Sequence, residues 1–133
     1  MKFKVHMVAF EDPIRVREVE VRDEEVSHCE NTEGILSCIY YWGQNDFQPL
    51  HCCSVSVGDV IELDPLTPDS VGCLDHEGGI EGPIDWTPGF WMVAGVGFYQ
   101  ITLEQFESHK ALPRIDRSMN AYKLEPKEDK VEA

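Results

Sequence analysis

The chain has 133 residues and a formal net charge of -14 at pH 7. This length suits one domain with a substantial core, while the charge argues against direct binding of a nucleic-acid backbone, which depends on Lys and Arg. The sequence has no apolar run near the roughly 20 residues of a membrane-spanning helix, and its first residues lack the basic segment followed by a long apolar stretch that is typical of a secretory leader. We therefore expect a soluble cytoplasmic protein, with no membrane association and with its five cysteines reduced.

The N-terminal residues have the pattern of a β-hairpin. Apolar residues at positions 3, 5 and 7 alternate with polar ones, which predicts a half-buried strand over residues 2–10. A turn at residues 11–13 leads to a second β-branched segment, residues 14–21. Because the apolar parity changes between Val16 and Val19, we expect a bulge near Arg17 and Glu18.

An amphipathic helix is expected next, over residues 33–42, where apolar residues recur at helical spacing. The candidates for its N-terminal cap are Ser27 or Asn31 and Thr32. Gly43 is placed to end this helix.

Two further apolar segments predict strands. The first, residues 55–63, contains a bend at Gly58 and Asp59. The second, residues 90–101, is predicted to be one continuous strand. We expect the central core to be formed by Val57, Ile61, Val96 and Phe98.

The C-terminal part begins with a capping box formed by Thr102 and Gln105, which predicts a short helix to about residue 110. Ile101 and Phe106 are spaced to form a hydrophobic staple around this cap. The apolar residues expected to dock the following segment are Leu112, Ile115, Met119 and Tyr122. The fold class is thus α+β, with a bent antiparallel sheet or partial small β-barrel and two helices. The domain spans residues 1–124, and residues 125–133 form a charged tail that we expect to be disordered.

Residues 34–103 contain neither Lys nor Arg. Their nine carboxylates are Asp46, Asp59, Glu62, Asp64, Asp69, Asp75, Glu77, Glu81 and Asp85. Such a negative surface either keeps a small protein soluble and monomeric or docks on a basic protein surface, for example by imitating nucleic-acid phosphates. The binding residues that we predict for docking are Asp69, Asp75, Glu77, Glu81 and Asp85. They belong to residues 64–89, which read either as a functional loop or as a surface insertion.

A group of Cys and His residues has the ligand types of tetrahedral zinc. Its members are His51, Cys52, Cys53, Cys73 and His76. Adjacent cysteines seldom bind one ion together, so we interpret these thiols as buried or idle and expect no cofactor. A zinc site, or a Cys/His nucleophile, is the alternative.

One part of the chain resembles a known family. The residues that carry the resemblance are a helix ending in Trp42-Gly43-Gln44, a loop over residues 45–51, the strand Ser-Val-Ser-Val-Gly-Asp-Val-Ile at residues 54–61, and residues 91–98. They resemble the YodL-like domain, a small module of bacteria, phages and plasmids. The Cys52-Cys53 pair and the long acidic insertion depart from that pattern. The Val-Gly-Asp-x-Ile corner is also similar to pseudouridine-synthase-associated and ASCH-type barrels.

Three functions are compatible with these features. The first is a small acidic, non-enzymatic protein-binding module, which the mobile-element setting of the resemblance would make an inhibitor. The second is a barrel-type nucleic-acid or nucleotide binder, and the third is a small Cys/His metal-dependent or thiol enzyme. We favour the first because residues 34–103 lack Lys and Arg.

Overall fold

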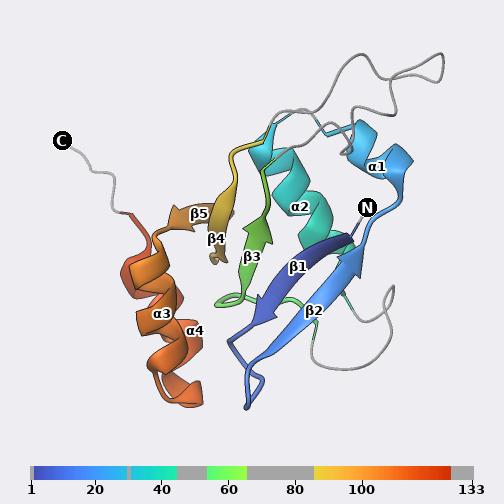
Figure 1. Cartoon of the computed structure of the whole chain (residues 1–133). Helices are drawn as coiled ribbons and strands as arrows, with labels where there is room; N and C mark the ends of the chain where they lie inside the picture. Colours follow the sequence, from blue (N-terminus) through green and yellow to red (C-terminus); the bar gives the residue numbers. More distant parts are fainter. Residues whose placement is uncertain (1, 30, 45–53, 66–85, 127–133) are drawn as a thin grey trace.

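The computed structural model describes residues 2–29, 31–44, 54–65 and 86–126. The elements in this part are β1 (Lys2–Met7), β2 (Arg15–Glu20), α1 (Asp23–Ser27), α2 (Thr32–Trp42), β3 (Val60–Leu63), β4 (Gly89–Val93), β5 (Phe98–Ile101), α3 (Leu103–Ala111) and α4 (Arg114–Leu124). The strands form one antiparallel sheet in the order β2-β1-β3-β4-β5. In Figure 1, β5 lies at a steep angle to β1 and β2, so the sheet is bent. This confirms the predicted α+β class, with an open sheet and no closed barrel among the described strands.

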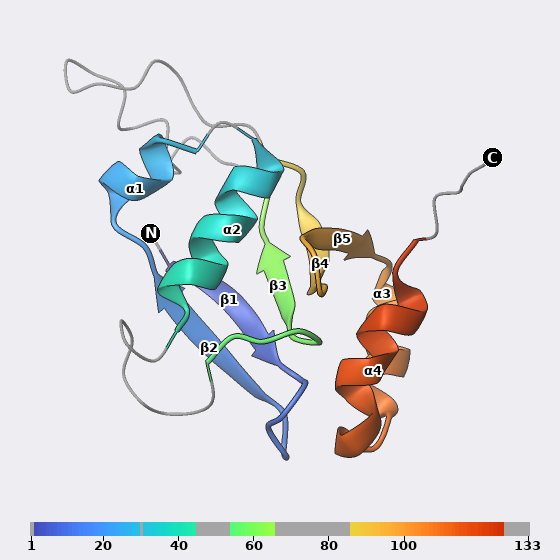
Figure 2. The same ribbon diagram turned by 180° about the vertical axis from the view of Figure 1, so that it is seen from behind.

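The first hydrophobic core lies between the sheet and α2. Ile35, Leu36 and Ile39 of α2 are buried in one cluster with Val5 of β1 and Val19 of β2. Figure 2 shows α2 lying in front of β1 and β3. The apolar side of α2, which the residue spacing predicted, therefore packs against the sheet.

The second core lies on the opposite face, because neighbouring residues of a strand point to opposite sides. Val60 of β3 and Met92 of β4 are buried there with Phe106 of α3 and Ala121 of α4. The Tyr99 hydroxyl of β5 donates a hydrogen bond to the Ala121 carbonyl. The two C-terminal helices are thus fastened to the β3–β5 half of the sheet (Figure 1).

The predicted helix caps are confirmed. Asn31 Oδ1 accepts a hydrogen bond of 2.8 Å from the Gly34 N–H at the start of α2, and Gly43 is the C-terminal cap. Thr102 and Gln105 form the reciprocal capping box of α3, with hydrogen bonds of 3.0 and 2.9 Å. The staple residues on either side of the box are both buried in the second core.

The predicted bulge in the second strand is wrong. Pairing of β1 with β2 keeps one register from Lys2↔Glu20 to Met7↔Arg15. The apolar parity changes because Arg17, and not Val16, faces the core: Arg17 is 6% exposed and Val16 is 54% exposed. Arg17 can be buried because its guanidinium donates a hydrogen bond of 3.0 Å to the Gly43 carbonyl at the end of α2.

The single strand predicted over residues 90–101 is also wrong. β4 and β5 form a hairpin, closed by a 3.0 Å hydrogen bond from the Ala94 N–H to the Gly97 carbonyl. Gly97 has a φ of 81°, which glycine adopts without steric cost. Val96 lies at the hairpin tip, 89% exposed, and is not a core residue. Ile61 is fully buried as predicted, whereas Val57 and Phe98 are half-buried against the core.

The helix count differs from the prediction as well, since the described residues form four helices instead of two. Sequence periodicity does not reveal α1, which is short and mostly polar and contributes Val26 to the core. In α4 the buried residues are Arg117 and Ala121. Among the larger apolar residues of α4 that were expected to dock, Ile115 and Met119 are exposed, whereas the half-exposed Tyr122 packs its ring against Gly95.

The strand predicted over residues 55–63 is shorter in the structure, where β3 covers Val60–Leu63. Gly58, with a φ of 100°, bends the chain just before it. Helix α3 packs against this bend, since His109 Nε2 lies 2.8 Å from the Gly58 carbonyl oxygen. In the described part of the chain, no helix has the length and apolar character required to cross a membrane.

Candidate functional site

The predicted site residues lie outside the described residues. This holds for the docking carboxylates Asp69, Asp75, Glu77, Glu81 and Asp85. It holds equally for the zinc candidates His51, Cys52, Cys53, Cys73 and His76. The candidate site in the described ranges consists instead of other charged residues and two other thiols. The described portion of the predicted tail is limited to Glu125 and Pro126.

Residues 34–103, which lack Lys and Arg, are called the base-free segment. Three of its carboxylates lie in the described residues, and their environments differ. Asp59 is 1% exposed, and its carboxylate accepts hydrogen bonds from the N–H groups of Ala9 at 2.9 Å and Ser56 at 2.8 Å. Burial raises the pKa of Asp59 to about 7, although these hydrogen bonds favour its ionised form. Asp59 therefore holds the β3 corner together and is not part of an acidic face, whereas Asp64 is exposed.

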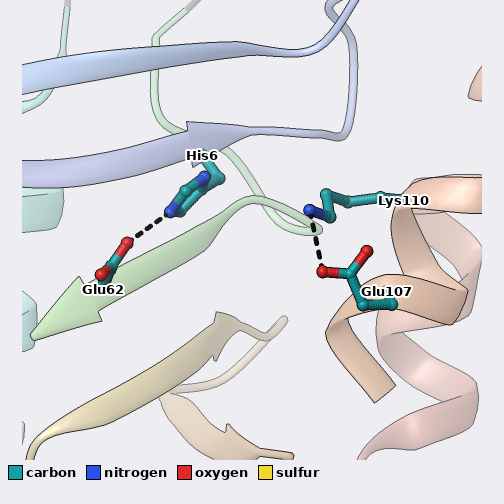
Figure 3. Close-up of polar contacts among 4 residues, drawn as sticks. All are labelled: His6, Glu62, Glu107 and Lys110. Atoms are coloured by element: carbon teal, nitrogen blue, oxygen red, sulfur yellow. Dashed lines mark hydrogen bonds and ion pairs between the residues drawn. The ribbon is translucent and has the colours of Figure 1, made fainter. Parts of the chain in front are cut away.

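Glu62 belongs to one of the two separate polar pairs drawn in Figure 3. Glu62 Oε1 lies 2.8 Å from His6 Nε2, and Lys110 on α3 lies beside Glu107. The His6 ring packs edge-on against Phe106, with 4.9 Å between the ring centroids. Because the His6 and Glu62 side chains are only 16% and 24% exposed, we assign this pair to joining β1 to β3 beneath α3.

Two arginines are withdrawn from the surface. Arg17 donates to the Gly43 carbonyl, as described above, and Arg117 of α4 is 7% exposed. Arg117 donates to the carbonyl oxygens of Leu112 at 2.8 Å, Val8 at 3.2 Å and Glu11 at 3.3 Å. Both guanidinium groups are thus committed to backbone acceptors, which leaves the outer surface with less positive charge than the sequence suggests.

An open groove of about 740 Å³ lies between α1 and α2. Its lining residues are Glu25, His28, Cys29, Asn31, Gly34, Ser37, Cys38, Tyr41 and Trp42. The helix on one side, α1, is only five residues long, and the helix on the other side, α2, begins at the Asn31 cap. Figure 2 shows α1 to the left of α2, on the side of the groove.

One wall of the groove already holds a cation from the same chain. The Arg22 guanidinium carbon lies 5.7 Å from the centre of a Trp42 ring, and an Arg22 nitrogen lies 3.4 Å from a Glu25 carboxylate oxygen. Tyr41, which is 55% exposed, packs edge-on against Trp42. An aromatic face next to a carboxylate is suited to bind guanidinium or ammonium groups.

The floor of the groove carries a pair of thiols. Cys29 follows α1 and Cys38 lies on α2, and the two side chains are joined by a hydrogen bond. This hydrogen bond lowers the pKa of Cys29 and raises the pKa of Cys38, because the Cys38 thiol donates to the Cys29 sulfur. This pair has no signal in the sequence, since a separation of nine residues is not a recognisable metal or redox spacing.

In the described ranges, no three His, Cys, Asp or Glu side chains are grouped so that they could hold a metal ion. No family model, curated protein or solved structure matches this chain.

Proposed function

We propose that this protein is a non-enzymatic protein-binding module whose acidic surface docks on a basic surface of a protein partner. The observation that carries the proposal is the absence of Lys and Arg from residues 34–103, which include nine carboxylates, of which, among the described residues, only the buried Asp59 is withheld from such a surface. Complementary potential raises association rates and suppresses wrong partners. The same charge opposes direct binding of DNA or RNA, whose phosphates require cations.

The buried arginines support this proposal. Arg17 and Arg117 are among the 11 Lys and Arg residues of the chain, but both are shielded and bound to carbonyl oxygens. Their positive charge is therefore poorly placed to attract an anionic ligand. The withdrawal of these two charges strengthens the negative character of the surface that a partner meets from solvent, and so a basic partner surface is favoured.

The groove between α1 and α2 supplies a second, shorter-range contact. Arg22 shows which group this wall accepts, because it lies over Trp42 and beside Glu25. We propose that an Arg or Lys side chain of the partner binds beside Tyr41 in the same way. Long-range attraction then brings the partner to the surface, and the groove fixes its orientation.

The resemblance to the YodL-like domain suggests the biological form of this binding. A module carried by mobile elements, with an acidic surface, would act as an inhibitor that occupies the phosphate-binding surface of a host nucleic-acid or defence enzyme. In this form of the proposal the carboxylates take the places of the phosphates.

Charge reversal provides the test. The test variant changes Asp75, Glu77, Glu81 and Asp85 to Lys, within the base-free segment. The matched control makes the same total change at four exposed carboxylates outside it, and these are Glu18, Glu104, Glu107 and Asp116. Wild type and both variants are used to capture proteins from host extract, and each captured protein is then purified and titrated against all three by calorimetry.

The proposal predicts a protein that binds wild type and the control variant but loses affinity for the test variant. Added salt should weaken the wild-type complex in the same direction. Equal binding by both variants would show that the base-free segment does not dock the partner. Preferential recovery of DNA or RNA would instead favour a nucleic-acid binder.

A further inference from the structure

The Cys29–Cys38 pair has a geometry that the acidic-surface function does not use. A Cβ built on Gly34 would lie 3.6 Å from the Cys29 Cβ, so the cysteine packs directly against α2 at this glycine. Cys38 follows Gly34 by four residues, which places it one helical turn further along the same side of α2. Both cysteines therefore lie at the junction between α1 and α2, and both line the open groove.

The two thiols are chemically unequal. The Cys29 thiol donates a hydrogen bond of 3.5 Å to the Glu25 carbonyl oxygen, and its contact with Cys38 favours the ionised form of Cys29 and lowers its pKa. The Cys38 thiol is held in its protonated form by the same contact, because ionisation of Cys38 would remove the donor. Cys29 is thus the thiol that supplies a nucleophilic thiolate, and Cys38 is adjacent to it.

We propose that Cys29 and Cys38 form a site of reversible oxidation, at which a low-molecular-weight disulfide converts the two thiols to an intramolecular disulfide. The Cys29 thiolate attacks one sulfur of the small disulfide and forms a mixed disulfide with that half. The other half leaves as a thiolate. Cys38 then loses its proton and attacks the Cys29 sulfur, which releases the second half as a thiolate. The protein loses two hydrogen atoms, and one small disulfide is reduced to two small thiols.

Formation of this bond requires the two sulfurs to move together. The sulfurs must close from hydrogen-bonding separation to about 2.05 Å. The segment that has to move is α1, which is five residues long and contributes Val26 to the core. Closing the bond ties α1 to α2 and changes the shape of the groove between them. This inference does not depend on the proposed protein-binding function, because its readout is the state of the sulfurs.

The test uses a chain in which Cys52, Cys53 and Cys73 are changed to Ser, so that only the pair remains. This protein is incubated with oxidised glutathione, quenched with acid and weighed intact by mass spectrometry without reduction. Two matched variants on the same background, Cys38→Ser and Cys29→Ser, isolate the two steps. Circular dichroism checks that all three proteins keep the same fold.

The two-cysteine protein should lose two hydrogen masses, retain no glutathione and recover its thiols with dithiothreitol. Cys38→Ser should accumulate a stable glutathione adduct, since the second attack is missing. Cys29→Ser should form its glutathione adduct at least about tenfold more slowly than Cys38→Ser, because the remaining thiol lacks an activating donor. Glutathione retained on both cysteines, equal rates in the two variants, or no reaction would each overturn the proposal.

A second measurement covers the case in which the serine background does not fold. The natural chain is treated with oxidised glutathione, digested without reduction and mapped by mass spectrometry. A cross-linked peptide pair containing Cys29 and Cys38 is the expected product. If the oxidised chain yields other pairings without this one, the assignment of the pair is wrong.

Discussion

Ile61→Ala should destabilise the protein far more than Val96→Ala, and this contrast tests the hairpin that replaces the expected single strand. Ile61 is fully buried in β3, opposite Val5 of β1 and Trp91 of β4. Losing three buried carbon atoms at about 0.8 kcal/mol each costs about 2.4 kcal/mol. The cavity that remains between the sheet and α2 raises the total to about 3 to 4 kcal/mol. Val96 is 89% exposed, so its truncation should change the free energy of unfolding by less than about 0.5 kcal/mol.

Urea unfolding measured by circular dichroism gives both values. For a chain of this size, 1 kcal/mol corresponds to about 4 °C in melting temperature, so Ile61→Ala should lower it by about 12 to 16 °C. The m-value should stay unchanged, since the described fold is the same in both variants. Comparable losses from the two substitutions would show that Val96 is a core residue, and the β4–β5 hairpin would then be wrong.

Three further predictions concern caps, glycines and titration. Thr102→Ala should lower the free energy of unfolding by about 1 kcal/mol, because the Gln105 N–H loses its acceptor; an unchanged urea midpoint would argue against the cap. Gly58→Ala should destabilise the protein more than Gly97→Ala. Both glycines have positive φ, but a Cβ on Gly58 would also lie 3.1 Å from the Cα of Ser118. Equal urea midpoints for the two variants would contradict this packing. Burial lowers the pKa of His109 below its ordinary 6.5, so the unfolded chain binds the proton first and stability falls as the pH drops below this value. The stability difference between wild type and His109→Gln should therefore shrink on acidification, and a difference that grows would refute the neutral buried ring.

Comparison with a variant is needed for the titration because a second buried group acts in the opposite sense. Burial raises the pKa of Asp59 from 3.8 to about 7, so the folded chain binds its proton more tightly. The stability that Asp59 contributes is present below the unfolded pKa and is lost as the pH rises towards 7. Both groups lie next to the Gly58 bend, and only the difference between variants separates them.

The local features of this fold follow from sequence because they depend on neighbouring residues. The capping box at Thr102 and the Asn31 and Gly43 ends of α2 are set by hydrogen bonds within one turn. The N-terminal hairpin follows from alternation along two adjacent segments. These predictions required no knowledge of distant contacts.

The errors arose where tertiary contacts overrule the local pattern. Val16 looks like a core residue, but Arg17 takes the inward position because the carbonyl at the end of α2 accepts its guanidinium. Gly95 and Gly97 were assigned to the interior of a strand, whereas Gly97 closes a hairpin. The Cys29–Cys38 pair depends on how α1 packs against α2, which no spacing rule encodes.

The most direct test of the central claim compares two labelled probes by fluorescence anisotropy, with purified wild-type protein at increasing salt. One probe is an oligo-arginine peptide, and the other is a nucleic acid of matched length, prepared as DNA and as RNA. Because residues 34–103 lack Lys and Arg, the account predicts salt-sensitive binding of the peptide and no binding of either nucleic acid. Salt-sensitive binding of DNA or RNA, with no binding of the peptide, would contradict it.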